Sequence, residues 1–568
     1  MTVEAQARHD LLDGVRILAG ASNETLDVLA ARLRRVRLHA AEWLFHAGDE
    51  AASLYVVASG RLRVVQSEQA GGRVLQEVGA GGVLGELALL TGSTRSASVQ
   101  AVRDCELYEL DADAFAAVLR SDAELGLSVA RELAAQLQAG ARAEPLPLRP
   151  AVLAVRSLDP DLDAAGFARR LASALERFGR VAVLDGGGTA PADRAAAVDR
   201  AEQGHAHVVL ADPGDDADWS AFCLRQSDRT LLLAGGLPAG PMIDLPAGLD
   251  LVVRSPLEGG EGGEVARLLD ALQPRTHHVV EDGDGGASVA RLARRLAGRS
   301  LGLVFSGGGA RGFAHVGVLA ELEADGFAVD RVGGCSMGAL IAAMVAAGWN
   351  AEEIRDRCRE ELVRRSPFND YTVPRVSLIR SRKAGRMLER LFGERRVEEL
   401  PLPLFTVSAD LLSSRQVVFR RGPLVEAVGT SMCIPGIAPP VPLLGGLLVD
   451  GGVLNNLPVD EMAAAGEGPI VAVDVIRRME VGEEADEARL PSIVETLARA
   501  TVLASVERAE RNRALAALVV APDVQQVPLR GFARLDEAVE AGRRAARAAL
   551  DEGGRDALRA LLDAAAGG

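Results

Sequence analysis

The most constraining feature of the sequence is an alternation of apolar and helical stretches between residues 301 and 348. The apolar run LGLVF leads into the glycine-rich stretch SGGGARG and then a helical stretch. The run FAVDRV leads into GGCSMG and a second helical stretch. Strands that alternate with helices in this way usually belong to a parallel sheet. The segment therefore predicts the first half of an α/β domain with a glycine-rich turn after each strand.

The rest of the chain divides into further segments, so a multidomain α/β protein is expected. Residues 1–140 begin as a helical stretch and continue as short alternating runs between turn residues, which predicts a small β-roll. The prolines of 141–150 predict a linker, and alternating buried strands and helices over 151–275 predict a middle parallel α/β domain. Then follow a connector over 276–300, the domain containing GGCSMG over 301–475, and a helical C-terminal extension over 476–568.

Composition narrows the class of protein. Hydrophobic residues make up 48% of the chain, yet no apolar run reaches the ~18 residues that a membrane-spanning helix needs. The first residues do not form a secretory signal, and the five scattered cysteines show neither disulfide nor zinc spacing. A net charge of −16 opposes nucleic-acid binding. We expect a cytoplasmic protein with no metal site and no nucleic-acid partner.

Ser336 lies in Gly-Cys-Ser-Met-Gly, where Gly334 and Gly338 allow the sharp strand-to-helix turn that exposes a nucleophilic serine. The pentapeptide alone fits an ordinary tight turn equally well. The last of the eight histidines is His315, so no histidine follows the serine as base, and His315 is expected to pack or bond locally. The single lysine, Lys383, does not form an S-x-x-K pair. A carboxylate base is therefore the remaining choice.

The candidate base is Asp450, which ends an apolar strand in LLVDGGVLNNLP and precedes Gly451 and Gly452. A carboxylate held against Ser336 could accept its proton if burial raises the proton affinity of the carboxylate. On its own, an aspartate before two glycines is more often a plain turn residue.

The glycine-rich stretch after the first strand predicts an anion site. The N–H groups of Gly307, Gly308 and Gly309 open onto a helix, and Arg311 and Gly312 follow; such a loop suits a tetrahedral oxyanion. The same residues also satisfy G-x-G-x-x-G, with Asp330 placed to bind a ribose in a dinucleotide fold. We favour the hydrolase because it uses all three motifs. A P-loop is excluded, since residue 313 is phenylalanine.

In this order and spacing, GGGARGFAHVGVL, GCSMG and DGGVLNNLP resemble the patatin-like phospholipases over residues 301–475. The resemblance implies an α/β hydrolase domain with Ser336 as nucleophile, Asp450 as base and the three loop glycines as oxyanion donors. It implies hydrolysis of lipid acyl esters through an acyl-enzyme, without a catalytic cofactor. The stretch SMCIPGIAPPVPLLGG resembles the family's proline-rich segment and suits an acyl-chain wall or interfacial contact; a buried core loop is the alternative.

The N-terminal domain contains GELALLTGSTRSASVQA, in which Glu86 and Arg95 could bind a cyclic phosphate and its ribose. A surface salt bridge between them is the alternative. The segment resembles the cyclic nucleotide-binding domain over about residues 15–135. That resemblance implies cAMP or cGMP as a regulatory ligand, although such domains also serve as ligand-free scaffolds. It places Gly85, Glu86, Leu87, Arg95, Ser96 and Ala97 in the phosphate-binding cassette.

The order of all these segments is similar to bacterial members of the neuropathy target esterase family. This resemblance implies a lysophospholipase acting on lysophospholipid or phospholipid, with the middle domain as a spacer or interaction domain. Two alternatives are a transcription regulator, which would need a basic helix-turn-helix, and a catalytically silent signalling scaffold. Peripheral contact with the inner membrane face is expected. The basic stretch Arg291, Arg294, Arg295 and Arg299 could lie on anionic lipid or pack on the hydrolase domain.

Overall fold

A computed structural model describes residues 21–66, 74–121, 151–159, 161–187, 193–237, 248–255, 263–476 and 493–563, with a few isolated positions besides. The chain forms two compact units. The first comprises Met1–Ser157, Asp163–Arg169 and Arg180–Leu231, and the second comprises Leu158–Leu162, Arg170–Gly179 and Leu232–Gly568. The predicted linker over 141–150 lies outside the described residues.

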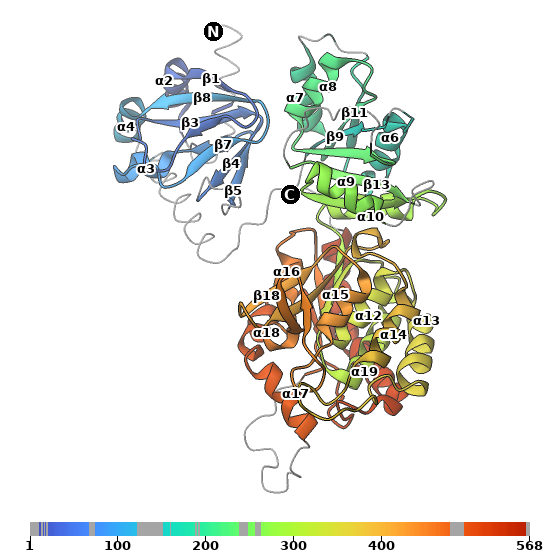
Figure 1. Ribbon diagram of the computed structural model, residues 1–568. Helices are drawn as coiled ribbons and strands as arrows, with labels where there is room; N and C mark the ends of the chain where they lie inside the picture. Colours follow the sequence, from blue (N-terminus) through green and yellow to red (C-terminus); the bar gives the residue numbers. More distant parts are fainter. Residues whose placement is uncertain are drawn as a thin grey trace. The chain divides into compact units, whose positions relative to one another are not determined.

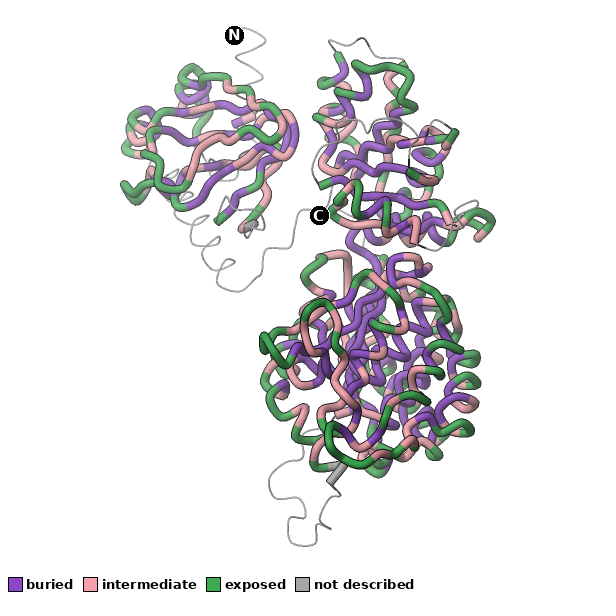
Figure 2. The backbone as a smooth tube through the Cα atoms, in the orientation of Figure 1, coloured by how far each residue is buried: buried purple, intermediate pink, exposed green. Residues whose placement is uncertain are grey.

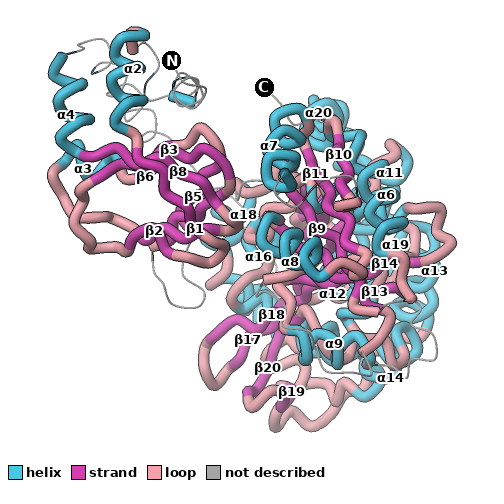
Figure 3. Tube along the Cα trace, turned by 90° about the horizontal axis from the view of Figure 1, so that it is seen from above, coloured by secondary structure: helices cyan, strands magenta, loops and turns pink. Residues whose placement is uncertain are grey.

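The N-terminal domain consists of two four-stranded sheets, ordered β1-β8-β3-β6 and β2-β7-β4-β5 (Figures 1 and 3). Alternating apolar residues of both sheets, among them Val57, Leu62, Val99 and Leu107, share one core. This is the predicted β-roll. Its elements are α2 (Asn23–Arg32), β1 (Arg34–Leu38), β2 (Trp43–Phe45), β3 (Ser53–Ser59), β4 (Arg61–Val65), β5 (Val74–Gly79), β6 (Val83–Leu84), α3 (Glu86–Thr91), β7 (Ser98–Ala101), β8 (Cys105–Asp111) and α4 (Ala112–Ser121).

The middle domain contains a six-stranded sheet ordered β10-β11-β9-β12-β13-β14. The pairs β10–β11, β11–β9 and β13–β14 are parallel, as the alternating sequence predicted. The sheet extends past the predicted boundary at 275, because β14 is its last strand. The elements are β9 (Val152–Ser157), α6 (Ala164–Leu175), β10 (Val181–Leu184), α7 (Arg194–Gly204), β11 (His207–Asp212), α8 (Ala217–Gln226), β12 (Arg229–Ala234), β13 (Asp250–Ser255), α9 (Glu264–Leu272) and β14 (Thr276–Glu281).

The C-terminal domain is built on a sheet ordered β19-β20-β17-β16-β15-β21-β22, with β18 paired to β17. Strands β17, β16, β15, β21 and β22 are parallel, β18 and β20 run antiparallel to β17, and β19 runs antiparallel to β20. All five residues of β15 are buried, and purple strands cross the middle of this domain in Figure 2. The strands are β15 (Leu301–Phe305), β16 (Val329–Cys335), β17 (Leu404–Asp410), β18 (Arg415–Phe419), β19 (Val441–Leu443), β20 (Gly446–Asp450), β21 (Ile470–Val473) and β22 (Leu518–Val520).

The predicted C-terminal extension contributes to this sheet and its helical cover. It supplies strand β22 as well as helices, and α19 packs against α11. A β-carbon at Gly317 or Gly542 would overlap backbone of the other helix, so these two glycines allow the close approach. The helices of the domain are α11 (Ala314–Ala324), α12 (Met337–Ala346), α13 (Ala351–Cys358), α14 (Arg382–Phe392), α15 (Leu424–Ser431), α16 (Val459–Ala463), α17 (Ile493–Leu503), α18 (Val506–Arg513), α19 (Leu535–Ala549) and α20 (Arg555–Asp563).

Helix α10 (Ala287–Leu296) carries the basic stretch that the sequence offered for anionic lipid. Arg294 forms an ion pair with Asp330 and Arg295 with Glu467, and Arg295 and Arg299 are buried. The packed alternative is therefore correct, and these arginines are not free for phosphates. Within the described residues, no helix is long and apolar enough to cross a membrane.

Candidate active site

Ser336 occupies the turn between strand β16 and helix α12. Its φ of 55° and ψ of −122° lie where L-residues are strained. The flanking glycines make the turn possible: a β-carbon at Gly334 would lie 2.6 Å from backbone of Gly338, and one at Gly338 would overlap the Phe305 carbonyl oxygen. This is the geometry of a nucleophile elbow, in which the backbone projects the serine side chain from the sheet.

The backbone of Ser336 is fixed by a residue that the sequence analysis did not identify. The Ser336 N–H donates to the Ser431 hydroxyl at 2.9 Å, and that hydroxyl donates to the Val407 carbonyl at 2.6 Å. Ser431 is fully buried at the end of α15. The elbow is therefore tied to strand β17, and the Ser336 N–H already has a partner. Ser431 is the first residue of the stretch SMCIPGIAPPVPLLGG, but that pattern does not show that its hydroxyl binds the elbow.

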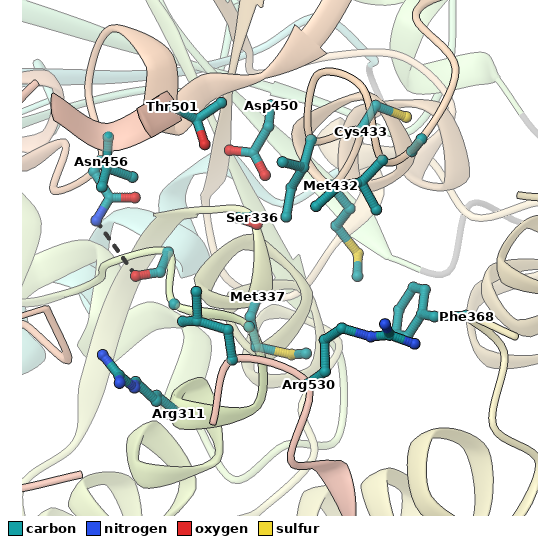
Figure 4. A pocket seen from close by; sticks show the side chains of 18 of the residues that line it. Arg311, Ser336, Met337, Phe368, Met432, Cys433, Asp450, Asn456, Thr501 and Arg530 are labelled. Atoms are coloured by element: carbon teal, nitrogen blue, oxygen red, sulfur yellow. Dashed lines mark hydrogen bonds between the residues drawn. The ribbon is translucent and has the colours of Figure 1, made fainter. Parts of the chain in front are cut away.

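Asp450 ends strand β20, which pairs with β17 so that Asp450 lies opposite Ser408. Its carboxylate lies beside Ser336 and accepts the Gly452 N–H at 2.8 Å and the Cys335 thiol at 3.6 Å. Figure 4 shows both side chains at one cavity. Burial outweighs the opposing effect of the neighbouring Ser336 hydroxyl and Gly452 N–H, so the pKa of Asp450 is raised to about 6. The proton affinity of this carboxylate is thus higher than that of an exposed aspartate.

His315 and Asp330 take no part in this arrangement. The His315 ring is fully buried, bonds to the Ser306 carbonyl at 2.9 Å, and lies against Phe305. It is the locally bonded residue that the sequence suggested. The Asp330 side chain is buried and accepts hydrogen bonds from Arg294 and from the Leu301 N–H. It cannot reach a ribose, so the dinucleotide reading of GGGARG is wrong.

The glycine-rich loop is held by Asn456, which lies in the quoted motif DGGVLNNLP but to which the sequence analysis gave no role. The Gly307 N–H donates to the Asn456 carbonyl at 3.2 Å, and the Asn456 side-chain amide donates to the Gly307 carbonyl at 3.3 Å (Figure 4). A β-carbon at Gly307 would lie 3.0 Å from that of Ser336. Within the described chain, no partner is recorded for the N–H groups of Gly308 and Gly309. These two N–H groups are therefore the free donors of the loop.

Arg311 connects the glycine-rich loop to the segment around residue 527. Its Nε donates to the Val527 carbonyl at 2.9 Å and its guanidinium also donates to the Gln525 carbonyl at 3.2 Å. The side chain is 9% exposed. These bonds hold the loop against residues 525–527, and they commit part of the guanidinium to the protein backbone. Its positive charge nevertheless stays beside the loop.

Ser336 and Asp450 lie in the wall of a cavity of about 700 Å³ whose lining is mainly apolar. The stretch SMCIPGIAPPVPLLGG supplies part of this wall, including Met432, Ile434, Ile437 and Val441. The opposite part comes from residues that the sequence analysis did not single out, because they belong to no motif. They include Phe368, Tyr371, Leu378, Ile379, Met387, Leu388 and Phe532.

The N-terminal domain places Glu86 and Arg95 together at the start of helix α3. Both are buried, so a surface salt bridge between them is excluded. The Arg95 guanidinium donates to the carbonyls of Gly85 at 3.0 Å and Ser53 at 2.6 Å and lies over the Phe45 ring. Burial lowers the pKa of Arg95 and raises that of Glu86.

The remaining cassette residues surround this pair. Gly85 adopts a φ of 85°, and a β-carbon there would overlap the Arg95 guanidinium. Ala97 is buried, whereas Leu87 is 40% exposed and Ser96 is also exposed. The Arg95 Nε is buried without a hydrogen-bond partner in the described residues. One donor of this guanidinium is thus unused.

Comparison with known proteins defines the class. The patatin-like phospholipase model matches residues 303–463, and the cyclic nucleotide-binding domain model matches residues 35–122. The chain is therefore a hydrolase of lipid esters that also contains a cyclic nucleotide-binding domain. This agrees with the elbow, the buried aspartate and the β-roll described above.

The relatives define the family. An NTE family protein of Mycobacterium tuberculosis is 36% identical over 95% of this chain and 96% of its own length. The chain belongs to the NTE (neuropathy target esterase) family. It is also similar to human patatin-like phospholipase domain-containing protein 6, with 29% identity over 76% of this chain and 37% of that protein.

The chain is also similar to a fungal lysophospholipase and to a solved structure of a bacterial activator protein. Lysophospholipase NTE1 of Cryptococcus neoformans is 27% identical over 94% of this chain and 39% of that protein. Among solved structures, the catabolite activator protein of Thermus thermophilus is 28% identical over 28% of this chain and 68% of that one, with a TM-score of 0.21.

Proposed function

We propose that the protein is a lysophospholipase or phospholipase in which Ser336 and Asp450 form a catalytic dyad. The observation that carries the proposal is the position of the buried Asp450 carboxyl group beside Ser336 in the wall of an apolar cavity. An apolar cavity of about 700 Å³ suits an acyl chain. The family similarity to a lysophospholipase supports the same substrate class.

In the proposed reaction, Asp450 accepts the Ser336 hydroxyl proton as the serine oxygen attacks the ester carbonyl. The N–H groups of Gly308 and Gly309 stabilise the oxyanion. The C–O bond to the glycerol oxygen then breaks, and that oxygen takes the proton from Asp450 and leaves as an alcohol. Water next gives a proton to Asp450 and attacks the acyl-serine. Collapse of this second oxyanion releases the fatty acid and returns the proton to Ser336.

Three further side chains support the proposed dyad without touching the reacting atoms. Ser431 orients the elbow, Asn456 holds the Gly307 backbone, and Arg311 ties the loop to the Val527 carbonyl. Preorganised donors lower the barrier because they need no rearrangement when the charge develops. We propose these three as positioning residues.

The dyad is tested by fatty-acid release from a lysophospholipid by wild type, Ser336→Ala and Asp450→Asn. Asp523→Asn serves as the matched control, because Asp523 is an exposed aspartate of the same domain. We expect both dyad variants to fall by at least about a thousandfold and the control to keep its rate. Full activity of Asp450→Asn would refute the base. A folded but inactive wild type would favour the signalling scaffold instead.

We also propose that the N-terminal domain binds a cyclic nucleotide, either cAMP or cGMP, and thereby regulates the hydrolase. The unused Arg95 Nε, the neighbouring Glu86 and the match of the domain model support this. Calorimetric titration of each nucleotide into wild type and Arg95→Gln tests it. We expect binding by wild type and at least a tenfold weaker affinity in the variant. Absence of heat with wild type at high protein concentration would identify a ligand-free scaffold.

We propose the cytoplasm as the site of action. All five cysteines are free and buried, which suits a reducing compartment. Localisation of a tagged full-length protein by cell fractionation checks this. Recovery from an oxidising compartment would contradict it.

A further inference from the structure

The segment Tyr371–Leu388 has two different faces. It follows a π-helix over Arg359–Arg364 and runs into helix α14 (Figure 1). One face forms part of the cavity wall that contains Ser336, and the residues of the segment on that face are Tyr371, Leu378, Ile379, Ser381, Ala384, Gly385, Met387 and Leu388. The other face is exposed. We call this segment the cavity rim.

The exposed face of the cavity rim carries large apolar side chains. Val373 is 73% exposed and Val376 is 71% exposed, and Tyr371, which also lines the cavity, is 57% exposed. Leu503, from helix α17, lines the same cavity and is 70% exposed. Exposed valines and leucines are ordinary when single, but a group of them on a segment that also lines an apolar cavity indicates an interaction surface.

The cavity rim is also basic in a strongly acidic chain. Between residues 371 and 388 there are five cationic side chains and no carboxylate, although the whole chain has a net charge of −16. All five are exposed, and the described part of the chain contains no ion pair to any of them. They are Arg375, Arg380, Arg382, Lys383 and Arg386. Some exposed arginines elsewhere in the domain are paired, as Arg355 and Arg359 are with Asp536.

We propose that the cavity rim docks on an anionic lipid surface. Val373 and Val376 then enter the acyl region while the five cations lie at the lipid phosphates. Apolar side chains interleaved with arginine and lysine are the pattern of interfacial binding. The inner face of the rim leads to Ser336, so a docked enzyme receives an acyl chain from the bilayer without exposing it to water. This inference rests on the proposed lipid substrate and adds the surface from which the lipid is taken.

The first test measures vesicle binding in full-length Ser336→Ala, which cannot consume the lipid. Co-sedimentation with phosphatidylcholine vesicles is compared with and without phosphatidylglycerol. We expect binding that requires phosphatidylglycerol and weakens with salt. The added changes Arg380→Gln, Arg382→Gln and Arg386→Gln should weaken it on the order of a hundredfold, at about fivefold for each cation.

The matched control is a second triple variant that removes three positive charges outside the cavity rim. Arg415→Gln, Arg511→Gln and Arg544→Gln also remove three exposed arginines of the C-terminal domain. We expect this control to bind vesicles nearly as well as its parent. Equal losses in the two triple variants would overturn the rim and leave only a general charge effect. Absence of any vesicle binding by the parent would overturn the proposal and leave the rim to an acidic protein partner.

The single lysine of the chain gives an independent test. Lys383 is exposed, and its Nζ donates to the Asn369 side chain at 2.8 Å. Acylation of Lys383 by an amine-reactive ester, followed by peptide mass spectrometry, should slow at least fivefold when phosphatidylglycerol vesicles are added. Labelling at an unchanged rate under conditions where the protein sediments with vesicles would place the contact elsewhere.

Kinetics separate this inference from the proposed function. The rim arginines do not line the cavity, so the rim variant with Ser336 intact should hydrolyse a soluble short-chain ester at the wild-type rate. Hydrolysis of lysophospholipid embedded in anionic vesicles should fall at least tenfold. An equal fall on both substrates would refute docking as the cause. A wild type that hydrolyses neither substrate would refute the proposed function, whereas vesicle binding would still test the rim.

Discussion

Asn456 and Gly307 bond to each other in both directions, through the Asn456 carbonyl and through its side-chain amide. Asn456 follows Asp450 by six residues, whereas Gly307 belongs to the glycine-rich loop after β15. The segment that carries the proposed base and the loop that carries the proposed oxyanion donors are therefore held in a fixed relation. The relative positions of the proposed base and the proposed oxyanion donors therefore depend on the two bonds between Asn456 and Gly307.

Replacing Asn456 by alanine should reduce catalysis more than stability. The change removes the side-chain bond to Gly307, so the loop loses one of its two bonds to Asn456. We expect kcat to fall roughly tenfold to a hundredfold with KM nearly unchanged, because oxyanion stabilisation acts in the transition state. Steady-state kinetics on a soluble ester measure the split. A rise in KM alone, or loss of the folded state by circular dichroism, would contradict a positioning role.

The Asp450 carboxyl group should set the lower pH limit of activity. Its pKa is raised to about 6 by burial, and a general base works only when deprotonated. We therefore expect kcat/KM to fall about tenfold per pH unit below that pKa and to level off above it. The profile is measured with a neutral soluble ester, and tryptophan fluorescence checks folding at each pH. A limit near 4 would mean that the base is not the buried Asp450.

The raised pKa of Asp450 also affects stability. Ionisation of Asp450, which activity requires, lowers the stability of the folded state. Because the folded pKa lies above the ordinary value of 3.8, ionised Asp450 destabilises the folded state. That cost is absent below about pH 4, grows between about 4 and 6, and is complete above 6. Asp450→Asn should therefore stabilise the domain by about 1 to 3 kcal/mol at pH 8, and by less at pH 4. Urea unfolding measures both; a difference independent of pH would contradict this account.

Gly338→Ala should destroy the elbow. A β-carbon there would overlap the Phe305 carbonyl oxygen, which belongs to a buried strand and cannot move away. We expect a destabilisation of about 3 kcal/mol or more and no measurable esterase activity. Thermal unfolding is compared with Gly204→Ala, where no atom lies near the added carbon. Normal unfolding and activity of Gly338→Ala would show that the turn has a different geometry.

Gly542→Ala should separate helices α11 and α19. The added carbon would overlap backbone of Ala314, so we expect a loss of about 1 to 3 kcal/mol. Arg543 and Arg547, which pair with Glu321 across the same contact, would be displaced with the helix. Denaturant unfolding tests this, with Arg544→Ala as the control on the exposed side of α19. An unchanged midpoint would mean that the contact adds nothing to stability.

The sequence predicted those parts of the fold that are formed by one short, continuous stretch of residues. The elbow around Ser336 and the β-roll around Arg95 are each encoded by short stretches of sequence. The spacing and residue types of these stretches are compatible with few local structures. The choice of Asp450 as base came from the absence of later histidines and from the resemblance, and the structure places Asp450 beside Ser336. Strands β14 and β22 lay outside the predicted boundaries, because short apolar runs near a boundary do not show which sheet they join.

Other parts of the site could not be predicted because their partners are distant in the chain. Ser431, Asn456 and Phe368 act through contacts that only the folded sheet creates. Arg295 and Arg382 lie in similar basic amphipathic stretches, yet one is buried against Glu467 and the other is exposed at the cavity rim. The sequence pattern predicts the charge of a helix face. Whether that face packs against the protein or stays exposed depends on whether carboxylates from other parts of the fold lie opposite it.

Strand β15 pairs with β21, β21 pairs with β22, and helix α19 covers α11. The catalytic domain therefore closes only after residue 549 has left the ribosome, although Ser336 emerges much earlier. The N-terminal β-roll has no such dependence and can fold first during synthesis. A growing chain would thus have its N-terminal β-roll in place before its hydrolase domain is complete.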